Sequence, residues 1–139
     1  MVVVLDSSVI AAFLSERDLF HGVAETRLRE LAARERLVAS AVSYAELLVG
    51  ARSGRHDETV VRGFFDDLID EVAPVDRRAA ESAALLRGRR RALRLADALV
   101  LGTAAVLDAG LVLTADQAWE GILEGGVVQV LDPGYPRRS

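Results

Sequence analysis

VVVLDSSVI, residues 2–10, joins an entirely apolar run to a carboxylate, Asp6, and then to a short apolar segment that suits a helix. Apolar runs without polar alternation are typical of strands buried on both faces of a parallel sheet. Similar runs lie at 37–39, 111–113 and 127–131, with a weaker one at 71–75. Helical segments are predicted between them at 8–15, 21–36, 44–52, 58–70, 77–91, 96–109 and 117–123. Strands that alternate with helices predict an α/β sandwich with a mostly parallel sheet.

The composition excludes several classes of chemistry. The chain has 139 residues, 51% of them apolar and 27% charged, which is typical of one soluble domain. Without cysteine it has no disulfides or thiolate zinc sites. All 17 basic residues are arginine, so a phosphate-binding loop that needs lysine and lysine Schiff-base chemistry are excluded. The sequence shows no signal peptide and no apolar stretch long enough to span a membrane, so we expect a cytoplasmic protein without membrane association.

Four carboxylates fall at the ends of predicted elements. Asp6 ends the first strand, and Glu46 lies on the first turn of the helix after the second strand. Asp97 opens the apolar helix, and Asp116 follows the strand at 111–113. Because ligands bind at the carboxyl ends of the strands in open α/β sheets, the four side chains are expected to meet at one edge.

Each carboxylate also has a purely structural interpretation. Asp6, Asp97 and Asp116 could each cap the helix that follows, and Ser43 with Glu46 matches a capping box. Four caps that converge on one edge would, however, repel one another unless a cation compensated their charge. Oxygen ligands favour Mg²⁺ or Mn²⁺ over zinc. Such ions activate water and stabilise charge on a phosphodiester, so no side-chain nucleophile is needed.

The stretches VVVLDSSVI, SYAELLVGA, LRLADALVLGTA and LVLTADQAW resemble the four acidic motifs of PIN-domain ribonucleases, in order and at typical spacing. The resemblance covers residues 2 to about 131, and the size is similar to that of VapC-type toxins of bacterial type II toxin–antitoxin modules. It implies a PIN-like three-layer sandwich with about five strands flanked by helices. The expected organisation is a PIN domain at 1–131 and a C-terminal tail at 132–139.

The resemblance also implies a function and a set of site residues. The expected activity is a metal-dependent endoribonuclease that uses one or two Mg²⁺ or Mn²⁺ ions, with a VapB-type antitoxin as partner and a homodimer as the assembly. The residues implied as catalytic and metal-binding are Asp6, Glu46, Asp97 and Asp116. Those implied to support them are Ser7, Ser8 and Thr114. The RNA target is not carried over, because the segments at 19–36 and 52–94 match only in general character.

An arginine cluster precedes the third acidic motif. Arginines between 87 and 94 are predicted to share one helical face, which could bind RNA phosphates, contact an acidic antitoxin segment, or only meet solvent. The candidate rim residues are Arg52, Arg55, Arg87, Arg91 and Arg94. His21 and His56 are expected at the surface, and Phe64, Phe65 and Trp119 in the core or a dimer surface.

Two alternatives stay open from the sequence. One is a PIN nuclease of RNA maturation without an antitoxin, and the other is a catalytically silent PIN module that only binds. Two other doubly wound classes are disfavoured. A receiver domain needs a lysine, and a haloacid-dehalogenase-type phosphatase needs a second aspartate where this chain has Ser8.

Overall fold

The computed structural model describes residues 1–134, so the end of the predicted tail, 135–139, lies outside the described residues. The strands are β1 Val2–Leu5, β2 Arg36–Ser40, β3 Glu71–Ala73, β4 Leu111–Thr114 and β5 Val128–Val130. The α-helices are α1 Ser7–Leu14, α2 His21–Ala32, α3 Ala41–Arg52, α4 Glu58–Leu68, α5 Arg77–Arg89 and α6 Leu95–Val106. Two 3₁₀ turns, η1 Gln117–Trp119 and η2 Glu124–Gly126, lie between β4 and β5.

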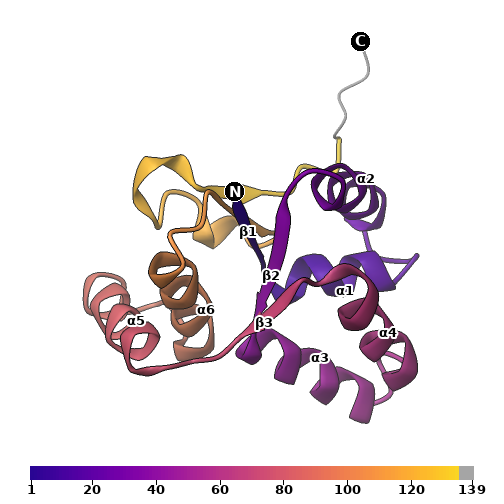
Figure 1. Ribbon diagram of the computed structural model, residues 1–139, viewed down its shortest axis with the longest axis horizontal. Helices are drawn as coiled ribbons and strands as arrows, with labels where there is room; N and C mark the ends of the chain where they lie inside the picture. The colour runs from indigo at the N-terminus through magenta and orange to yellow at the C-terminus, as the bar shows by residue number, and fades with distance from the viewer. Residues whose placement is uncertain (135–139) are drawn as a thin grey trace.

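The five strands form one parallel sheet in the order β3-β2-β1-β4-β5. Helices α1 to α4 lie on one side of it and α5 and α6 on the other (Figure 1). The predicted three-layer α/β sandwich with a parallel five-stranded sheet is therefore confirmed. The chain leaves β1 toward β2 and later returns to β4 on the other side of β1, so the direction of winding reverses between β1 and β4. Ligands of doubly wound folds bind outside the strand ends at such a reversal.

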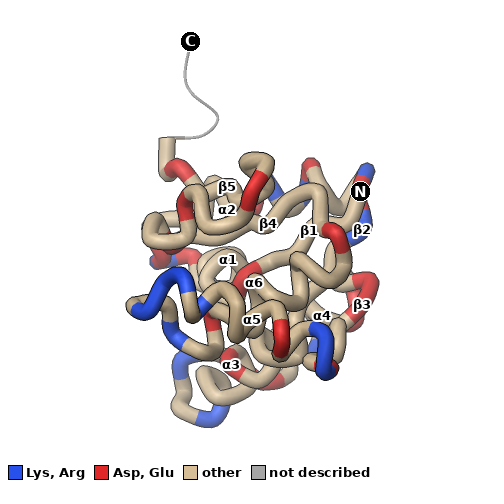
Figure 2. The backbone as a smooth tube through the Cα atoms, turned by 90° about the vertical axis from the view of Figure 1, so that its left-hand side faces the viewer, with Lys and Arg blue, Asp and Glu red and all other residues tan. Residues whose placement is uncertain are grey.

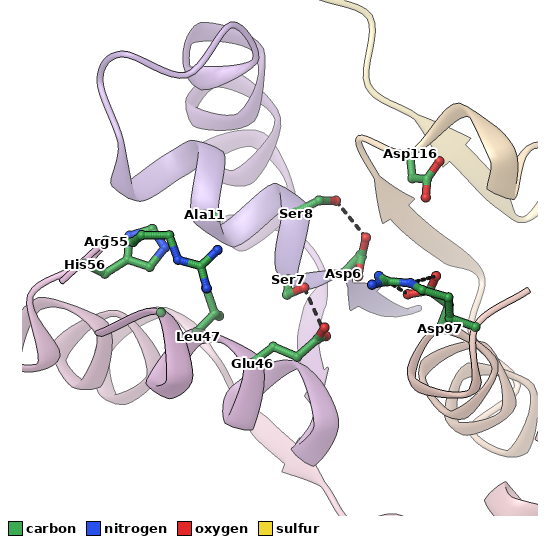
Figure 3. Close-up of a pocket in the computed structure, with 12 residues that line it drawn as sticks. Asp6, Ser7, Ser8, Ala11, Glu46, Leu47, Arg55, His56, Asp97 and Asp116 are labelled. Atoms are coloured by element: carbon green, nitrogen blue, oxygen red, sulfur yellow. Dashed lines mark hydrogen bonds and ion pairs between the residues drawn. The ribbon is translucent and has the colours of Figure 1, made fainter. Parts of the chain in front are cut away.

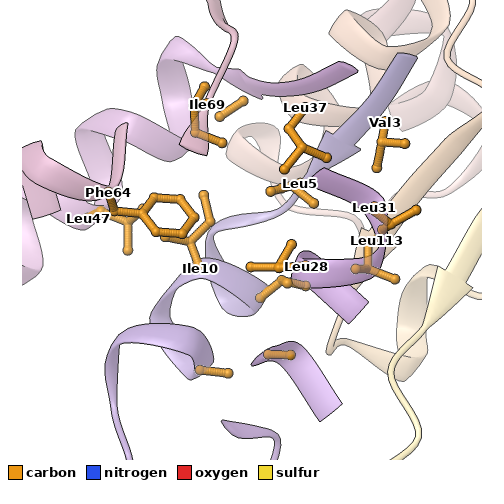
Figure 4. Packing of buried hydrophobic residues seen from close by; sticks show 14 of the residues in the cluster. Val3, Leu5, Ile10, Leu28, Leu31, Leu37, Leu47, Phe64, Ile69 and Leu113 are labelled. Carbon is orange, nitrogen blue, oxygen red and sulfur yellow. The ribbon is translucent and has the colours of Figure 1, made fainter. Parts of the chain in front are cut away.

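Successive side chains of each strand point to opposite faces of the sheet, so the protein has two hydrophobic cores. Val3 and Leu5 of β1 point into the core shared with α1 to α4, whereas Val4 points into the core shared with α5 and α6. The first of these cores also holds Phe64 and Ile10 (Figure 4). Because both faces of the sheet are covered, the apolar runs of the sequence show no polar alternation.

Close packing of α5 on α6 fixes the helix that carries Asp97. A Cβ atom on Gly102 would lie 2.6 Å from the carbonyl oxygen of Ala79 and 2.9 Å from the backbone nitrogen of Ala83. The small residues let the two backbones approach, and the apolar part of α6 packs into the core as its composition predicts. The helix therefore presents Asp97 from a rigid element.

Several predicted boundaries were wrong. The helix predicted at 21–36 ends at Ala32, because Arg36 already pairs with β1. Helix α3 begins at Ala41 with Ser40 as its cap, so Glu46 lies on the second turn and the predicted capping box of Ser43 and Glu46 does not form. The helix predicted at 117–123 is only a 3₁₀ turn over Gln117–Trp119. None of the helices within residues 1–134 is long and apolar enough to cross a membrane.

Candidate active site

A hollow of about 250 Å³ lies at the carboxyl ends of β1 and β4. Its walls include all four predicted carboxylates, which come from four separate parts of the chain (Figure 3). We call this hollow the acidic pocket. Its lining residues are Asp6, Ser7, Ser8, Ala11, Glu46, Leu47, Gly50, Arg55, His56, Arg94, Asp97 and Asp116.

Asp6 is held by two hydroxyl groups. Its Oδ2 atom accepts hydrogen bonds from Ser8 Oγ at 2.7 Å and from Thr114 Oγ1 at 2.9 Å. The same hydroxyls accept hydrogen bonds from the backbone amides of Ala115 and Asp116, both at 3.0 Å, which orients their protons toward Asp6. Asp6 stands at the N-cap position of α1, but its side chain makes no capping hydrogen bond. Among residues 1–134, Asp6 Oδ1 has no hydrogen-bond partner and remains free to bind a cation.

The burial of Asp6 affects its charge. Only 5% of the residue is exposed, and this desolvation is the largest effect on the carboxyl, raising its pKa above the ordinary value. The hydrogen bonds from Ser8 and Thr114 favour the charged form and oppose the shift, while the charges of Asp97 and Glu46 add to it. A cation bound in the acidic pocket would reverse the repulsion and stabilise the ionised form of Asp6.

Asp97 is paired with an arginine. Arg94 donates from Nε to Asp97 Oδ2 and from Nη2 to Asp97 Oδ1, both at 3.3 Å. The hydrogen bond with Asp97 is the largest cause of a raised pKa of Arg94, and the charges of Asp97, Glu46 and Asp116 contribute to it. Asp97 does not cap its helix, because Arg94 occupies the N-cap position. The guanidinium of Arg94 thus lies at the acidic pocket as an internal counter-charge.

Glu46 and Asp116 complete the acidic side of the pocket. Glu46 Oε1 accepts a hydrogen bond from Ser7 Oγ at 3.2 Å, which links α3 to the start of α1. Asp116 is exposed, and its Oδ1 atom caps η1 by accepting from the backbone amide of Ala118 at 2.9 Å. The capping interpretation is therefore confirmed for Asp116, and the hydroxyl-bearing residues predicted as support contact the carboxylates.

The donor set fits a hard cation, although it is not a closed cage. Within residues 1–134, no three acidic, histidine or cysteine side chains lie close enough together to hold a metal ion as they stand. Mg²⁺ keeps several waters and binds through one or two carboxylates together with substrate phosphates, so it needs no preformed cage. The carboxylate oxygens that line the acidic pocket, the free Oδ1 of Asp6 among them, are ligands of this kind. Metal binding by these four residues stays a prediction.

The arginines predicted as a rim separate into two groups. Arg55 and Arg94 line the acidic pocket, whereas the other three do not. Arg52 pairs with Glu58, and Arg87 donates to the backbone oxygens of Leu93 and Arg91 in the α5–α6 connection; Arg91 itself is exposed there. The expectation of a single helical face was wrong, because α5 ends at Arg89 and the chain turns before α6 begins at Leu95.

The sequence predicts His56 at the surface, but His56 is half-buried and lines the acidic pocket. No spacing in the sequence relates His56 to the acidic motifs. Phe64, Phe65 and Trp119 are buried in the core, as expected.

The PIN domain family model matches residues 3–122. No curated protein matches the chain. Among solved structures, the fold is similar to VapBC2 from Rickettsia felis, bound to a promoter DNA fragment, with a TM-score of 0.77 and 14% identity over 95% of this chain and 100% of that chain. A toxin–antitoxin complex from Klebsiella pneumoniae gives a TM-score of 0.74 and 21% identity over 94% and 97% of the two chains.

A further similar structure is VapC20 from Mycobacterium tuberculosis, described as a toxin that cleaves the sarcin–ricin loop. It gives a TM-score of 0.61 and 18% identity over 79% of this chain and 86% of that chain. At these identities the structures support the fold, and the family model covers most of the sequence. The chain belongs to the PIN domain family.

Proposed function

We propose that the chain is a Mg²⁺- or Mn²⁺-dependent endoribonuclease that acts as the toxin of a VapBC-type toxin–antitoxin pair. The observation that carries this proposal is that four carboxylates from separate elements line one pocket of a PIN domain. Toxin–antitoxin complexes and an RNA-cleaving toxin among the similar structures support the choice of substrate and partner.

Each acidic residue has a distinct role in this proposal. Asp6, fixed by Ser8 and Thr114, offers its free Oδ1 atom as the central ligand. Asp97 would be a second ligand, and Glu46 and Asp116 would hold water molecules of the ion or a second ion. When bound, the metal supplies charge neutralisation for the phosphodiester and lowers the pKa of the attacking water.

Arg94 has a second role in the same reaction. Its side chain is 73% exposed and contacts Asp97 through only two long hydrogen bonds, so it can move at little cost. If Asp97 held a metal ion instead of Arg94, the guanidinium would be available to contact a phosphate of the RNA. Arginine suits this role because its planar fork of donors matches phosphate oxygens.

The direct test is cleavage of RNA by the purified protein. We expect Mg²⁺ or Mn²⁺ to support cleavage, EDTA to abolish it, and Asp97→Asn to lower the rate by at least about 100-fold, as expected when a metal ligand is lost from such a site. Sequencing of the RNA ends would identify the target. Undiminished cleavage in EDTA, or by Asp97→Asn, would contradict the proposed chemistry.

The toxin role is tested separately in cells. We expect induced expression to arrest growth, and the product of the neighbouring gene to rescue it by binding the toxin. Harmless expression of the folded, RNA-cleaving protein would instead favour a nuclease of RNA maturation. The proposed homodimer is tested by the mass of the purified protein in solution.

A further inference from the structure

The acidic pocket has a basic end that the four-carboxylate chemistry does not use. Arg55 and His56 line the pocket together with Gly50, in the connection between α3 and α4. In Figure 3 the guanidinium of Arg55 extends toward Ser7, on the side of the pocket away from Asp97 and Asp116. The pocket therefore carries positive charge at one end and carboxylates at the other.

The backbone that carries Arg55 is fixed by the end of α3. Gly54 adopts a φ of +81°, which favours glycine, and its amide donates to the carbonyl oxygen of Ala51 at 3.1 Å. The amide of Arg55 donates to the carbonyl oxygen of Gly50 at 2.9 Å. These two bonds are those of a Schellman motif, which ends a helix in one defined direction. Arg55 consequently leaves α3 at a set position beside the pocket.

The imidazole ring of His56 packs against Gly50, which leaves room for it. A Cβ atom on Gly50 would lie 2.9 Å from His56 Cδ2, so a larger residue would displace the ring. The neighbouring carboxylate, Asp57, is engaged elsewhere, because its Oδ1 accepts from the amides of Thr59 and Val60 at 2.8 and 3.2 Å. The ring therefore lies against Gly50 at the pocket wall, and the carboxylate nearest to it in the sequence caps α4.

Arg55 also differs from the other arginines near the pocket in having no partner. Its side chain makes no ion pair or hydrogen bond within residues 1–134, whereas Arg52 pairs with Glu58 and Arg94 pairs with Asp97. The unpaired guanidinium of Arg55 and the neighbouring imidazole of His56 offer several N–H donors to an anionic ligand.

We propose that Arg55 and His56 form a second phosphate site, which binds a backbone phosphate of single-stranded RNA beside the one placed at the carboxylates. This inference rests on the proposed function, since the cleaved strand enters the same pocket. RNA is favoured over an acidic protein segment because one strand supplies regularly spaced phosphates to both ends of the pocket. The phosphate to be cleaved, at the carboxylates, and its neighbour, at Arg55 and His56, would then fix the strand in the pocket.

The experiment measures binding of a fluorescein-labelled, mixed-sequence single-stranded RNA to the full chain carrying Asp97→Asn, which is expected to slow cleavage. We expect Arg55→Gln to weaken binding about five- to tenfold. It should also lower the slope of log Kd against log salt concentration by about 0.7, the value for one lost phosphate contact on a single strand. Arg78→Gln, which removes the same charge from an exposed position of α5, is the matched control and should change neither the affinity nor the slope by more than the error.

A second variant changes Gly50, against which the ring of His56 packs. We expect Gly50→Ala to weaken RNA binding about threefold without unfolding the protein, because the added methyl group meets the end of a side chain and not backbone. His56→Gln should weaken binding by a similar factor, and the double variant should be no weaker than either single one, since both remove the same contact.

Three results would overturn the inference. Unchanged affinity and salt slope in Arg55→Gln, with tight binding by the parent, would refute the second phosphate site and leave the proposed function intact. If Arg55→Gln weakened binding of the antitoxin but left RNA binding unchanged, the Arg55 end of the pocket would be a protein contact. A parent protein that binds no RNA would refute the proposed function together with the inference.

Discussion

The acidic pocket contains two buried carboxylates that the fold holds in opposite ways. At the ends of β1 and β4, Asp6 is bound by the neutral hydroxyls of Ser8 and Thr114. At the start of α6, Asp97 is bound by the charged guanidinium of Arg94. Neutral donors fix a carboxylate in place but leave its charge uncompensated, whereas the arginine compensates the charge.

The two regions also differ in how easily the partner can leave. Thr114 is fully buried, and its hydroxyl is committed as donor to Asp6 and as acceptor from the amide of Asp116. Arg94 is long, exposed and joined only to a residue three positions away. The difference indicates that the contact of Asp6 with Thr114, at the ends of β1 and β4, is a permanent part of the fold. Arg94, at the start of α6, is an exchangeable counter-charge for Asp97.

The largest expected effect on stability comes from a change at the permanent contact between Asp6 and Thr114. Thr114→Val keeps the shape of the side chain but removes one donor from Asp6 and one acceptor from the amide of Asp116. We expect the free energy of unfolding in urea to fall by about 1–3 kcal/mol. Thr103→Val is the matched control, because the buried hydroxyl of Thr103 donates only to the carbonyl oxygen of Leu99 in its own helix. Equal losses for the two variants would contradict a special role of the Thr114 hydroxyl.

The uncompensated charge of Asp6 predicts a pH dependence of the metal-free protein. Burial raises the pKa of Asp6 in the fold above its unfolded value. The contribution of Asp6 to stability is therefore present below the unfolded pKa and is lost as the pH rises through the folded pKa. We expect Asp6→Asn to gain stability relative to the wild type as the pH is raised from about 4, near the ordinary pKa of aspartate. Urea unfolding in EDTA measures the difference, and a difference independent of pH would contradict the effect of burial.

A smaller effect is expected at the start of α6, where Arg94 is the exchangeable counter-charge. There the property that changes is metal affinity. Arg94 competes with a cation for the oxygens of Asp97, so Arg94→Gln should tighten Mn²⁺ binding in the absence of RNA about fivefold. Arg89→Gln removes the same charge at the end of α5 and serves as the control. If both variants tighten binding equally, net charge and not the contact with Asp97 is responsible.

Much of the fold and the acidic residues could be predicted from the sequence, for one physical reason. Strands buried on both faces, such as β1 and β4, carry apolar runs that are visible without a structure. A parallel sheet brings their carboxyl ends to one edge, so Asp6 and Asp116 had to lie near each other once both strands were recognised. Glu46 and Asp97 stand near the starts of predicted helices, and the resemblance to the PIN family assigns them to the same site.

The features that were missed depend on where a helix ends. The sequence predicts one shared face for the arginines at 87–94 because no glycine or proline directly follows Arg89, where α5 ends. His56 reaches the acidic pocket because the Schellman turn at Gly54 reverses the chain and Gly50 leaves room for the ring. Such contacts follow from backbone direction and close approach, which hydrophobic periodicity does not encode.

The most direct test of the central claim is the binding of Mn²⁺ to the wild type and to Asp97→Asn without RNA, measured from the signal of free Mn²⁺ in electron paramagnetic resonance. We predict that the wild type binds one or two ions and that Asp97→Asn weakens this binding at least about tenfold, while its metal-free form stays folded. Equal binding by the two proteins would contradict the assignment of the acidic pocket as a metal site.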